Sequence, residues 1–201
     1  MKKLLVKLYE HFKPFTLSYS QEGEDMILKY IFGKKKDGFY VDVGAYHPRR
    51  FSNTYHFYKK GWHGINIDAN DMTGFKTTRD RDINLQLVVG DGNTKIYRKF
   101  KEGAFNTCYD NYVVGSDFIG GVSCTSHSLS TILKDCKVNK IDFMSIDVEG
   151  MDLEVLQSND WDKYKPTVIL IEDSDEFITV YLKSLGYKLA AKTLHTLIFK
   201  L

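Results

Sequence analysis

The chain has 201 residues, 43% hydrophobic and 27% charged, which is an ordinary composition for one globular domain with a full core. Its formal net charge of +2 at pH 7 is too small for the strongly basic surface of a nucleic-acid-binding protein. We therefore expect a single domain over residues 1–201 and no nucleic-acid partner.

Cysteine spacing and hydropathy indicate the compartment. The three cysteines, Cys108, Cys124 and Cys136, show no CxxC spacing, which argues against a disulfide framework or a zinc site and favours a reducing compartment. No apolar run approaches the roughly 18 residues that span a bilayer. Residues 1–15 are basic and amphipathic, and we expect a short helix there that packs on the domain, with a peripheral membrane contact as the weaker alternative. The protein is thus expected to be cytoplasmic, without stable membrane insertion.

Helical and strand patterns alternate through the first half of the chain. Gly61 is a suitable C-cap for the helix expected at residues 53–60. A polar segment covers residues 71–81, and the apolar run "INLQLVV" that follows it is predicted as one strand. In chain order we expect a helix at 25–32, a strand at 38–43, a helix at 53–60, a strand at 64–68 and a third strand at 83–89.

The middle of the chain, residues 91–125, has little periodicity, although "TKIYRKF" alternates like an exposed antiparallel strand. Regular patterns return afterwards. We expect a helix at 128–136, a strand at 141–146, a helix at 151–157, a strand at 166–172, a helix at 175–185 and an antiparallel hairpin within 187–201.

This alternation predicts an α/β fold, in which right-handed crossovers build a mostly parallel sheet with helices on both faces. The C-terminal hairpin adds an antiparallel edge. Ligands of such sheets bind beyond the carboxyl ends of the strands, so the chemistry is expected there.

Carboxylates stand at or directly after the ends of five predicted strands. They are Asp42, Asp68, Asp91 (after Gly90), Asp147 with Glu149, and Glu172 with Asp173. Any one of them could cap a helix. Because parallel strands present their carboxyl ends together, the five positions are expected to converge on one cleft.

The turn after the first of these strands contains Gly44-Ala45-Tyr46-His47-Pro48 and lacks the G-x-G-x-x-G pattern of dinucleotide sites. Asp42 would repel a diphosphate at close range. S-adenosylmethionine has no phosphate and carries a sulfonium and an ammonium, so an acidic first turn suits it. Asp68, at the end of the second strand, stands where a carboxylate accepts hydrogen bonds from a ribose diol in either nucleotide class.

Four stretches of the chain resemble the FkbM family of methyltransferases. They are "SQEGEDMIL" (Ser20–Leu28), "FYVDVGAYHP" (Phe39–Pro48), "SNTYHFYKKGWHGINIDAN" (Ser52–Asn70) and "IDFMSIDVEGMDLEVL" (Ile141–Leu156). The resemblance runs over residues 20–199. It implies a class I, Rossmann-like sheet of seven strands, S-adenosylmethionine as the methyl donor, and a sugar, glycan or natural product with a free hydroxyl as the acceptor.

The resemblance also implies roles for individual residues. Residues 1–36 would form a helical extension, with Gln21, that covers the cofactor site of a core at 37–201. The implied cofactor contacts are Asp42, Gly44 and Ala45 at the methionine end, Asp68, Ala69 and Asn70 at the ribose, Val89, Gly90 and Asp91 near the adenine, and Asp147 on the catalytic side. The family often has Glu where this chain has Asp68.

Methyl transfer to oxygen is an in-line displacement that needs aligned reactants and a base for the hydroxyl proton. The candidate bases are Asp147, Glu149 and His47; His47 is equally well explained as a loop histidine bonded to backbone. His127 is a weaker candidate because it is expected to help cap the following helix. Asp147, Glu149 and Glu172 are of the type that holds a divalent metal such as Mg²⁺, although their spacing does not demand one.

The segment 103–126 has the glycines and aromatics of an adaptable acceptor-binding wall. Tyr109, Tyr112 and Phe118 either stack on a sugar ring or pack the loop on the core, and packing is expected for at least two of them. Two other functions stay open: an NAD(P)-dependent oxidoreductase, and a non-catalytic nucleotide-binding module of the same fold. The oligomeric state is not indicated by the sequence.

Overall fold

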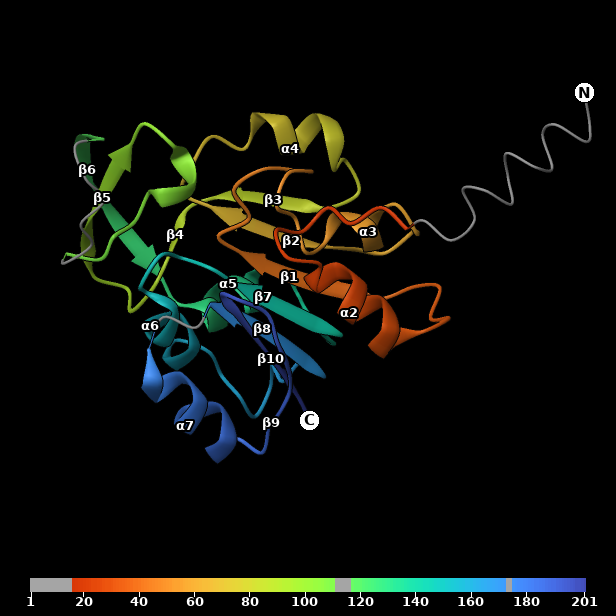
Figure 1. Cartoon of the computed structure of the whole chain (residues 1–201). Helices are drawn as coiled ribbons and strands as arrows, with labels where there is room; N and C mark the ends of the chain where they lie inside the picture. Colours follow the sequence, from red (N-terminus) through yellow and green to blue (C-terminus); the bar gives the residue numbers. More distant parts are fainter. Residues whose placement is uncertain (1–15, 111–116, 173–174) are drawn as a thin grey trace, which may run out of the picture.

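A seven-stranded sheet in the order β3-β2-β1-β7-β8-β10-β9 forms the centre of the protein in the computed structural model, which describes residues 16–110, 117–172 and 175–201 (Figure 1). Strands β3, β2, β1, β7 and β8 are parallel, and β10 runs antiparallel to both β8 and β9. The expected mostly parallel sheet and its C-terminal hairpin are confirmed. The strands are β1 (Phe39–Val43), β2 (His63–Asp68), β3 (Ile83–Gln86), β7 (Phe143–Ile146), β8 (Val168–Glu172), β9 (Lys188–Lys192) and β10 (Thr196–Lys200).

Helices cover both faces of this sheet because the buried strands project apolar side chains alternately to either side. On one face, Tyr40 of β1 packs with Leu28, Phe57 and Trp62. On the other face, Val41 of β1 packs with helices from the second half of the chain. The first face carries α2 (Glu24–Phe32) and α3 (Tyr55–Tyr58), and the second carries α5 (Leu129–Asp135), α6 (Asp152–Gln157) and α7 (Glu176–Ser184).

A second, three-stranded sheet lies at one end of the first and has the order β4-β6-β5 (Figure 1). It consists of β4 (Val88–Val89), β5 (Thr94–Phe100) and β6 (Phe118–His127), with the short helix η1 (Gly103–Phe105) between the last two. The expected antiparallel strand at 94–100 is confirmed. The ten-residue β6 has no clear sequence pattern, because Gly120, Gly121 and several polar residues interrupt its alternation.

The single strand predicted at 83–89 is wrong. Residues 83–86 pair with β2 in the main sheet, whereas Val88 and Val89 pair with β6. The switch occurs where β2 ends, since the N–H of Leu87 donates to the carbonyl of Asp68 (3.0 Å). The polar segment 71–81 also contains a helix, α4 (Thr73–Thr78), and the helix expected at 53–60 is reduced to α3. The predicted helix at 1–15 lies outside the described residues.

Within the described part of the chain, no helix combines the length and the apolar character that crossing a membrane requires.

A fully buried arginine ties the loop after β1 to the main sheet. Arg79 donates from Nε to Asp82 Oδ2 (2.9 Å), from Nη1 to the carbonyl of Pro48 (3.1 Å) and from Nη2 to the hydroxyl of Tyr40 (2.7 Å). It also donates to the hydroxyl of Thr54 (3.0 Å). One guanidinium thus connects the loop of residues 44–54 to strand β1 and to the residue that precedes β3.

Replacing Arg79 by methionine is expected to lower the free energy of unfolding by about 3 kcal/mol, because it leaves the Asp82 carboxylate buried without its cation. Urea denaturation measures the change. Arg81→Met is the matched control, since that guanidinium lies over the ring of Tyr58 (4.1 Å) near the surface and its loss should cost less than about 1 kcal/mol. Equal urea midpoints for the two variants would contradict the anchoring role.

Candidate active site

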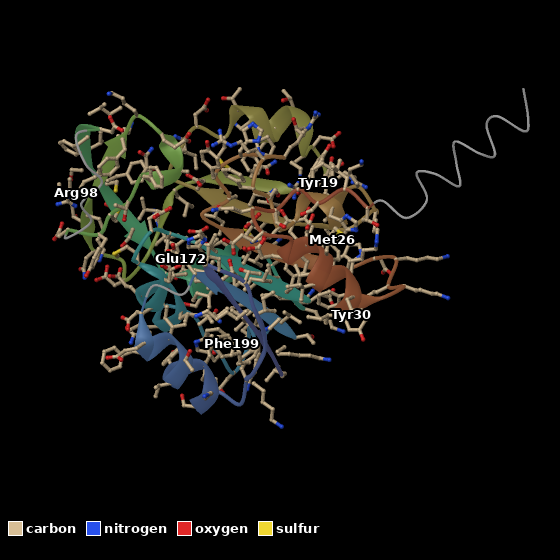
Figure 2. All side chains as sticks on the ribbon, viewed as in Figure 1. Tyr19, Met26, Tyr30, Arg98, Glu172 and Phe199 are labelled. Carbon is tan, nitrogen blue, oxygen red and sulfur yellow. The ribbon has the colours of Figure 1, made fainter. Side chains whose placement is uncertain are left out.

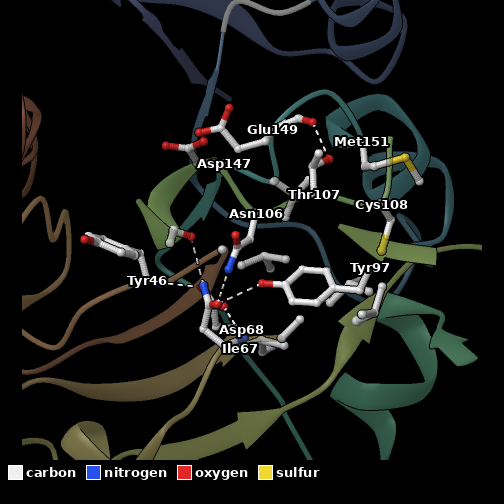
Figure 3. Close-up of a pocket in the computed structure, with 18 of the residues that line it drawn as sticks. Tyr46, Ile67, Asp68, Tyr97, Asn106, Thr107, Cys108, Asp147, Glu149 and Met151 are labelled. Carbon is white, nitrogen blue, oxygen red and sulfur yellow. Dashed lines mark hydrogen bonds between the residues drawn. The ribbon is translucent and has the colours of Figure 1, made fainter. Parts of the chain in front are cut away.

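A cavity lies at the carboxyl ends of β1, β2 and β7 and is bounded on its other side by the β5–β6 segment (Figure 3). We call it the inner pocket. From the main sheet it receives Gly44, Asp68, Asp147 and Glu149. Its apolar lining includes Leu87, Val88, Val89 and Met151.

The turn at Gly44 brings the ends of β1 and β7 into direct contact. A Cβ atom on Gly44 would lie 1.7 Å from the carbonyl oxygen of Asp147, and its φ of +79° is in the left-handed region. The N–H groups of Gly44 and Ala45 both donate to the carbonyl of Ile67 (2.9 and 3.1 Å), so the turn is also fixed to β2. Only glycine satisfies both the angle and the space.

Asp68 at the end of β2 holds two loops with one carboxylate. Its Oδ2 accepts from the N–H of Tyr46 (2.7 Å) and its Oδ1 from the N–H of Asn70 (2.7 Å). Burial raises the pKa of Asp68, and these backbone donors oppose the rise. The carboxylate therefore lines the inner pocket in a fixed orientation.

Asn70 connects the β2 loop to the β5–β6 segment (Figure 3). Its Oδ1 accepts from the hydroxyl of Tyr97 (3.0 Å) and from Nδ2 of Asn106 (2.6 Å), and its own Nδ2 donates to the carbonyl of Gly103 (3.1 Å). The sequence reasoning missed Tyr97 and Asn106 as pocket residues. The alternation in "TKIYRKF" held a signal for Tyr97, since this position is buried between two more exposed neighbours.

Asp147 and Glu149 follow β7 and lie side by side in Figure 3. Glu149 has a positive φ of 54°, and its carbonyl accepts from the hydroxyl of Thr107 (2.7 Å), so the β5–β6 segment also fixes this turn. Asp147 is exposed to solvent, although many protein atoms surround its carboxyl group. Desolvation raises its pKa well above the usual range, and the nearby carboxylates of Asp152, Glu172 and Glu149 raise it further.

A second cavity, which we call the outer recess, meets the inner pocket at Gly44, Tyr46, Ala104, Asp147 and Glu149. The segment before α2, the loop after β1, η1 and the β9–β10 turn form its walls. Gln21 and Glu172 line this recess rather than the inner pocket. Gly44, Asp68, Ala69, Asn70, Val89, Asp147 and Glu149 are the predicted site residues that line the inner pocket.

Five predicted site residues line neither cavity. Asp42 lies beneath the turn and accepts from the hydroxyl of Thr54 (2.8 Å), and Ala45 packs with Met72 and Phe75. Gly90 donates its N–H to the carbonyl of His127 (2.9 Å). Asp91 pairs with Lys95 (3.2 Å), and His47 Nδ1 accepts from the backbone N–H groups of Arg49 and Arg50 (3.1 and 2.9 Å).

His127 does not have the capping role predicted for it. Ser128, not His127, caps α5, because its hydroxyl accepts from the N–H of Thr131 (3.3 Å), while His127 ends β6. Phe118 packs edge-on against Phe100 at 5.7 Å between ring centroids. Tyr109 packs against Gly150, and Tyr112 lies outside the described residues.

The described residues contain no group of three or more His, Cys, Asp or Glu side chains placed to hold a metal ion. Asp147, Glu149 and Glu172 line the same recess but do not form such a group in this conformation.

Asp42 provides a test of the electrostatics beneath the site. Desolvation raises its pKa to about 6, against the opposing effects of the Thr54 hydroxyl and Arg79. The folded state therefore binds this proton more tightly than the unfolded chain, whose aspartates titrate near pH 3.9. The free energy of unfolding should fall by roughly 3 kcal/mol as pH rises from about 3 to about 7, and about 2 kcal/mol of this fall lies between pH 4 and pH 6.

Asp42→Asn should remove this part of the pH dependence, and urea denaturation at several pH values measures it. The exposed Asp37→Asn is the control and should follow the wild-type curve. Parallel wild-type and Asp42→Asn curves between pH 4 and 6 would show that Asp42 ionises like an exposed aspartate.

The strand order, and a pocket at the carboxyl ends of β1 and β2, are consistent with a Rossmann-like methyltransferase. The family model described as "Methyltransferase FkbM domain" matches residues 42–189. The chain therefore belongs to the FkbM methyltransferase family, and the resemblance seen in its motifs is confirmed. Searches of curated proteins and of solved structures found no match.

Proposed function

We propose that this protein is an S-adenosylmethionine-dependent O-methyltransferase that acts on a hydroxyl of a sugar, glycan or natural product. The observation that carries the proposal is a pair of joined cavities: an inner pocket with one fixed carboxylate, Asp68, and an outer recess that meets it at Asp147 and Glu149. One cavity suits a nucleoside cofactor and the other an acceptor. The proposal includes a single domain over residues 1–201 and no nucleic-acid partner.

The residues of the inner pocket fit a phosphate-free nucleoside. Asp68 would accept from the ribose diol, and the apolar side chains of Leu87, Val88 and Met151 would contact the adenine ring. At Gly44 the turn offers no glycine-rich loop for a pyrophosphate, and the nearby Asp147 carboxylate would repel one. When bound, the donor supplies an electrophilic methyl group on a sulfonium.

Asp147 and Glu149 are the proposed bases. Either carboxylate would accept the proton of the acceptor hydroxyl when the bound donor supplies the methyl group to that oxygen. A raised pKa makes Asp147 a stronger proton acceptor than an ordinary aspartate. His47 lies outside both cavities with Nδ1 bonded to backbone, which favours the carboxylates over the histidine.

Gln21 and the segment that precedes α2 form one wall of the outer recess. We propose that this part of residues 1–36 covers the methionine end of the bound cofactor. No step of the proposed reaction is assigned to a metal, because Asp147, Glu149 and Glu172 do not form a metal-binding group in this conformation, and activity measured with and without Mg²⁺ tests the requirement.

Calorimetric titration with S-adenosylhomocysteine and with NADH tests the cofactor class. We expect micromolar affinity for S-adenosylhomocysteine and no measurable binding of NADH. The reverse result would indicate an oxidoreductase. Mass spectrometry of sugars, nucleotide-sugars and glycolipids incubated with S-adenosylmethionine, with and without magnesium, should then detect a methyl gain; cofactor binding without any transfer would favour the non-catalytic module.

A further inference from the structure

Exposed aromatic rings line the outer recess. Phe51 is 45% exposed and Phe105 is 39% exposed, although both line this cavity. Tyr46 lines it as well, and its ring is nearly parallel to that of Phe51 (interplanar angle 23°, centroids 6.5 Å apart). We call Tyr46, Phe51 and Phe105 the aromatic shelf. Apolar ring surface that is exposed in a cavity favours a ligand that removes it from water.

Two of the three shelf residues have a strained backbone. Among the described residues, four other than glycine have a positive φ, and three of these line the outer recess: Tyr46 (51°), Phe51 (56°) and Glu149 (54°). This left-handed conformation costs free energy for any residue with a Cβ atom and is unusual for large side chains. Such strain persists where the surrounding contacts impose it, and it is concentrated at functional sites. The backbone of Phe51 therefore supports a function for its ring in the recess.

Hydrogen bonds before and after Phe51 hold the shelf in place. Before it, the hydroxyl of Tyr46 donates to Glu102 Oε1 (2.5 Å). After it, the N–H of Ser52 donates to the carbonyl of Tyr19 (3.0 Å), a residue that is labelled in Figure 2. The rings of Tyr46 and Phe51 are therefore oriented before a ligand arrives, which lowers the entropic cost of binding.

Two amide side chains line the same recess. Gln21 comes from the segment before α2, and Asn53 comes from the loop after β1. The Asn53 amide is oriented by Ser145, whose hydroxyl accepts from its Nδ2 (3.0 Å). An amide both donates and accepts, so it can hydrogen-bond to a hydroxyl group in either sense. Aromatic surface with a few polar groups is the combination by which pockets bind and orient a ligand.

A saturated ring that carries hydroxyl groups matches both features. The C–H groups on one face of a pyranose form an apolar surface that covers an aromatic ring, while the hydroxyl groups at its edge reach polar side chains. An open-chain polyol carries similar hydroxyl groups, but it has no fixed apolar face and loses conformational freedom when it binds. The shelf is therefore expected to distinguish acceptors by the shape of their apolar surface.

We propose that the aromatic shelf binds the acceptor as a pyranose ring, which packs by its C–H face on the shelf while Gln21 and Asn53 bind its hydroxyl groups. The inference rests on the proposed function, since it takes the outer recess as the acceptor site. It narrows the acceptor from any sugar, glycan or natural product with a hydroxyl to one that presents a pyranose ring.

Matched pairs of a ring and an open chain test the proposal: the methyl pyranosides of glucose, galactose and mannose, each against the corresponding alditol. Titrations use the full chain with S-adenosylhomocysteine at saturation, and saturation-transfer NMR measures the affinity. We expect at least one pyranoside to bind more tightly than its alditol by about 5-fold or more, because the ring is already rigid.

A smaller difference in all three pairs would overturn the proposal, and so would failure of all three pyranosides to bind. Failure of the proposed function is read separately, from the absence of S-adenosylhomocysteine binding. The titrations are repeated without cofactor, so that the preference of the recess for a ring is measured in either case.

Phe51→Ala and Phe105→Ala should each weaken pyranoside binding by about 5-fold or more, because each removes apolar surface that the ring covers. Neither change should alter the affinity for S-adenosylhomocysteine. The matched control is Phe177→Ala, whose ring is 61% exposed on α7 and absent from the described lining of both cavities. Unchanged pyranoside affinity in both shelf variants, or an equal loss in Phe177→Ala, would show that the pyranosides bind elsewhere.

Phe51→Gly separates the loss of the ring from a change in the loop. Glycine adopts a positive φ without strain, so this variant should have a higher urea midpoint than Phe51→Ala. Its pyranoside affinity should stay as low as that of Phe51→Ala, because both lack the ring. Recovery of wild-type affinity in Phe51→Gly would show that the loop conformation, and not the aromatic ring, controls binding, and would overturn the proposal.

Discussion

Replacing Gly44 by alanine is expected to abolish S-adenosylhomocysteine binding and to lower the free energy of unfolding by about 5 kcal/mol. The new Cβ would stand 1.7 Å from the Asp147 carbonyl oxygen, and backbone atoms cannot move away as a flexible side chain would. The ends of β1 and β7 must separate, and this displaces the carboxylates at the junction of the two cavities. Calorimetry measures the affinity, and urea denaturation the stability.

Gly92→Ala is the matched control for this change. Gly92 has a similar positive φ of +92°, but a Cβ there would meet nothing within 4 Å. Its replacement should cost only the left-handed backbone penalty of about 1–2 kcal/mol and leave the cofactor affinity unchanged. If Gly44→Ala and Gly92→Ala lost the same stability and both bound cofactor normally, the close approach of the two strand ends would not be essential.

Asp68→Asn is expected to weaken S-adenosylhomocysteine binding about 100-fold, equivalent to about 2.7 kcal/mol. An amide offers one oxygen where the carboxylate offers two, so its NH₂ group would face the N–H of Tyr46 or of Asn70. One of these two buried N–H groups would then lack an acceptor, which raises the free energy of the folded site. The proposed contact with the ribose would also lose its negative charge. Calorimetric titration of the variant measures the loss.

Asp71→Asn, in the same loop, is the control. A single oxygen of Asp71 accepts both the N–H (3.1 Å) and the hydroxyl (2.7 Å) of Thr73 at an exposed position, so an asparagine preserves both hydrogen bonds. We expect an affinity within about twofold of wild type and a stability change below about 0.5 kcal/mol. Wild-type affinity in Asp68→Asn would remove this carboxylate from the cofactor site.

The sequence predicted the positions of the strand-end residues of the main sheet, because the apolar run that marks a strand also shows where that strand ends. A buried strand reads as an apolar run, and a parallel sheet gathers its carboxyl ends, so Gly44, Asp68, Asp147 and Glu149 were expected together and do line one pocket. Asp42 shows the limit of that reasoning. Alternation along β1 turns its side chain toward Thr54 beneath the turn, and it lines neither cavity.

Tyr97 and Asn106 could not be placed in the same way. Their contact with Asn70 depends on the β5–β6 segment folding back over the β2 loop, which pairs residues far apart in the chain. Gly120 and Gly121 break the alternation of β6, so the sequence predicted only β5 of the two strands in this hairpin. The outer recess is harder still to foresee, since its walls come from the segment before α2, the loop after β1, η1 and the β9–β10 turn.

The sequence by itself determined the α/β class, the seven-stranded sheet, the family and the strand-end carboxylates, because periodicity and short motifs encode local structure. Only the tertiary structure decided which of those carboxylates share a cavity, that His47 points its Nδ1 at backbone instead, and that exposed aromatic rings line the recess beside the pocket. These facts depend on contacts between distant segments. Such contacts are set by packing and strand pairing, which no local pattern specifies.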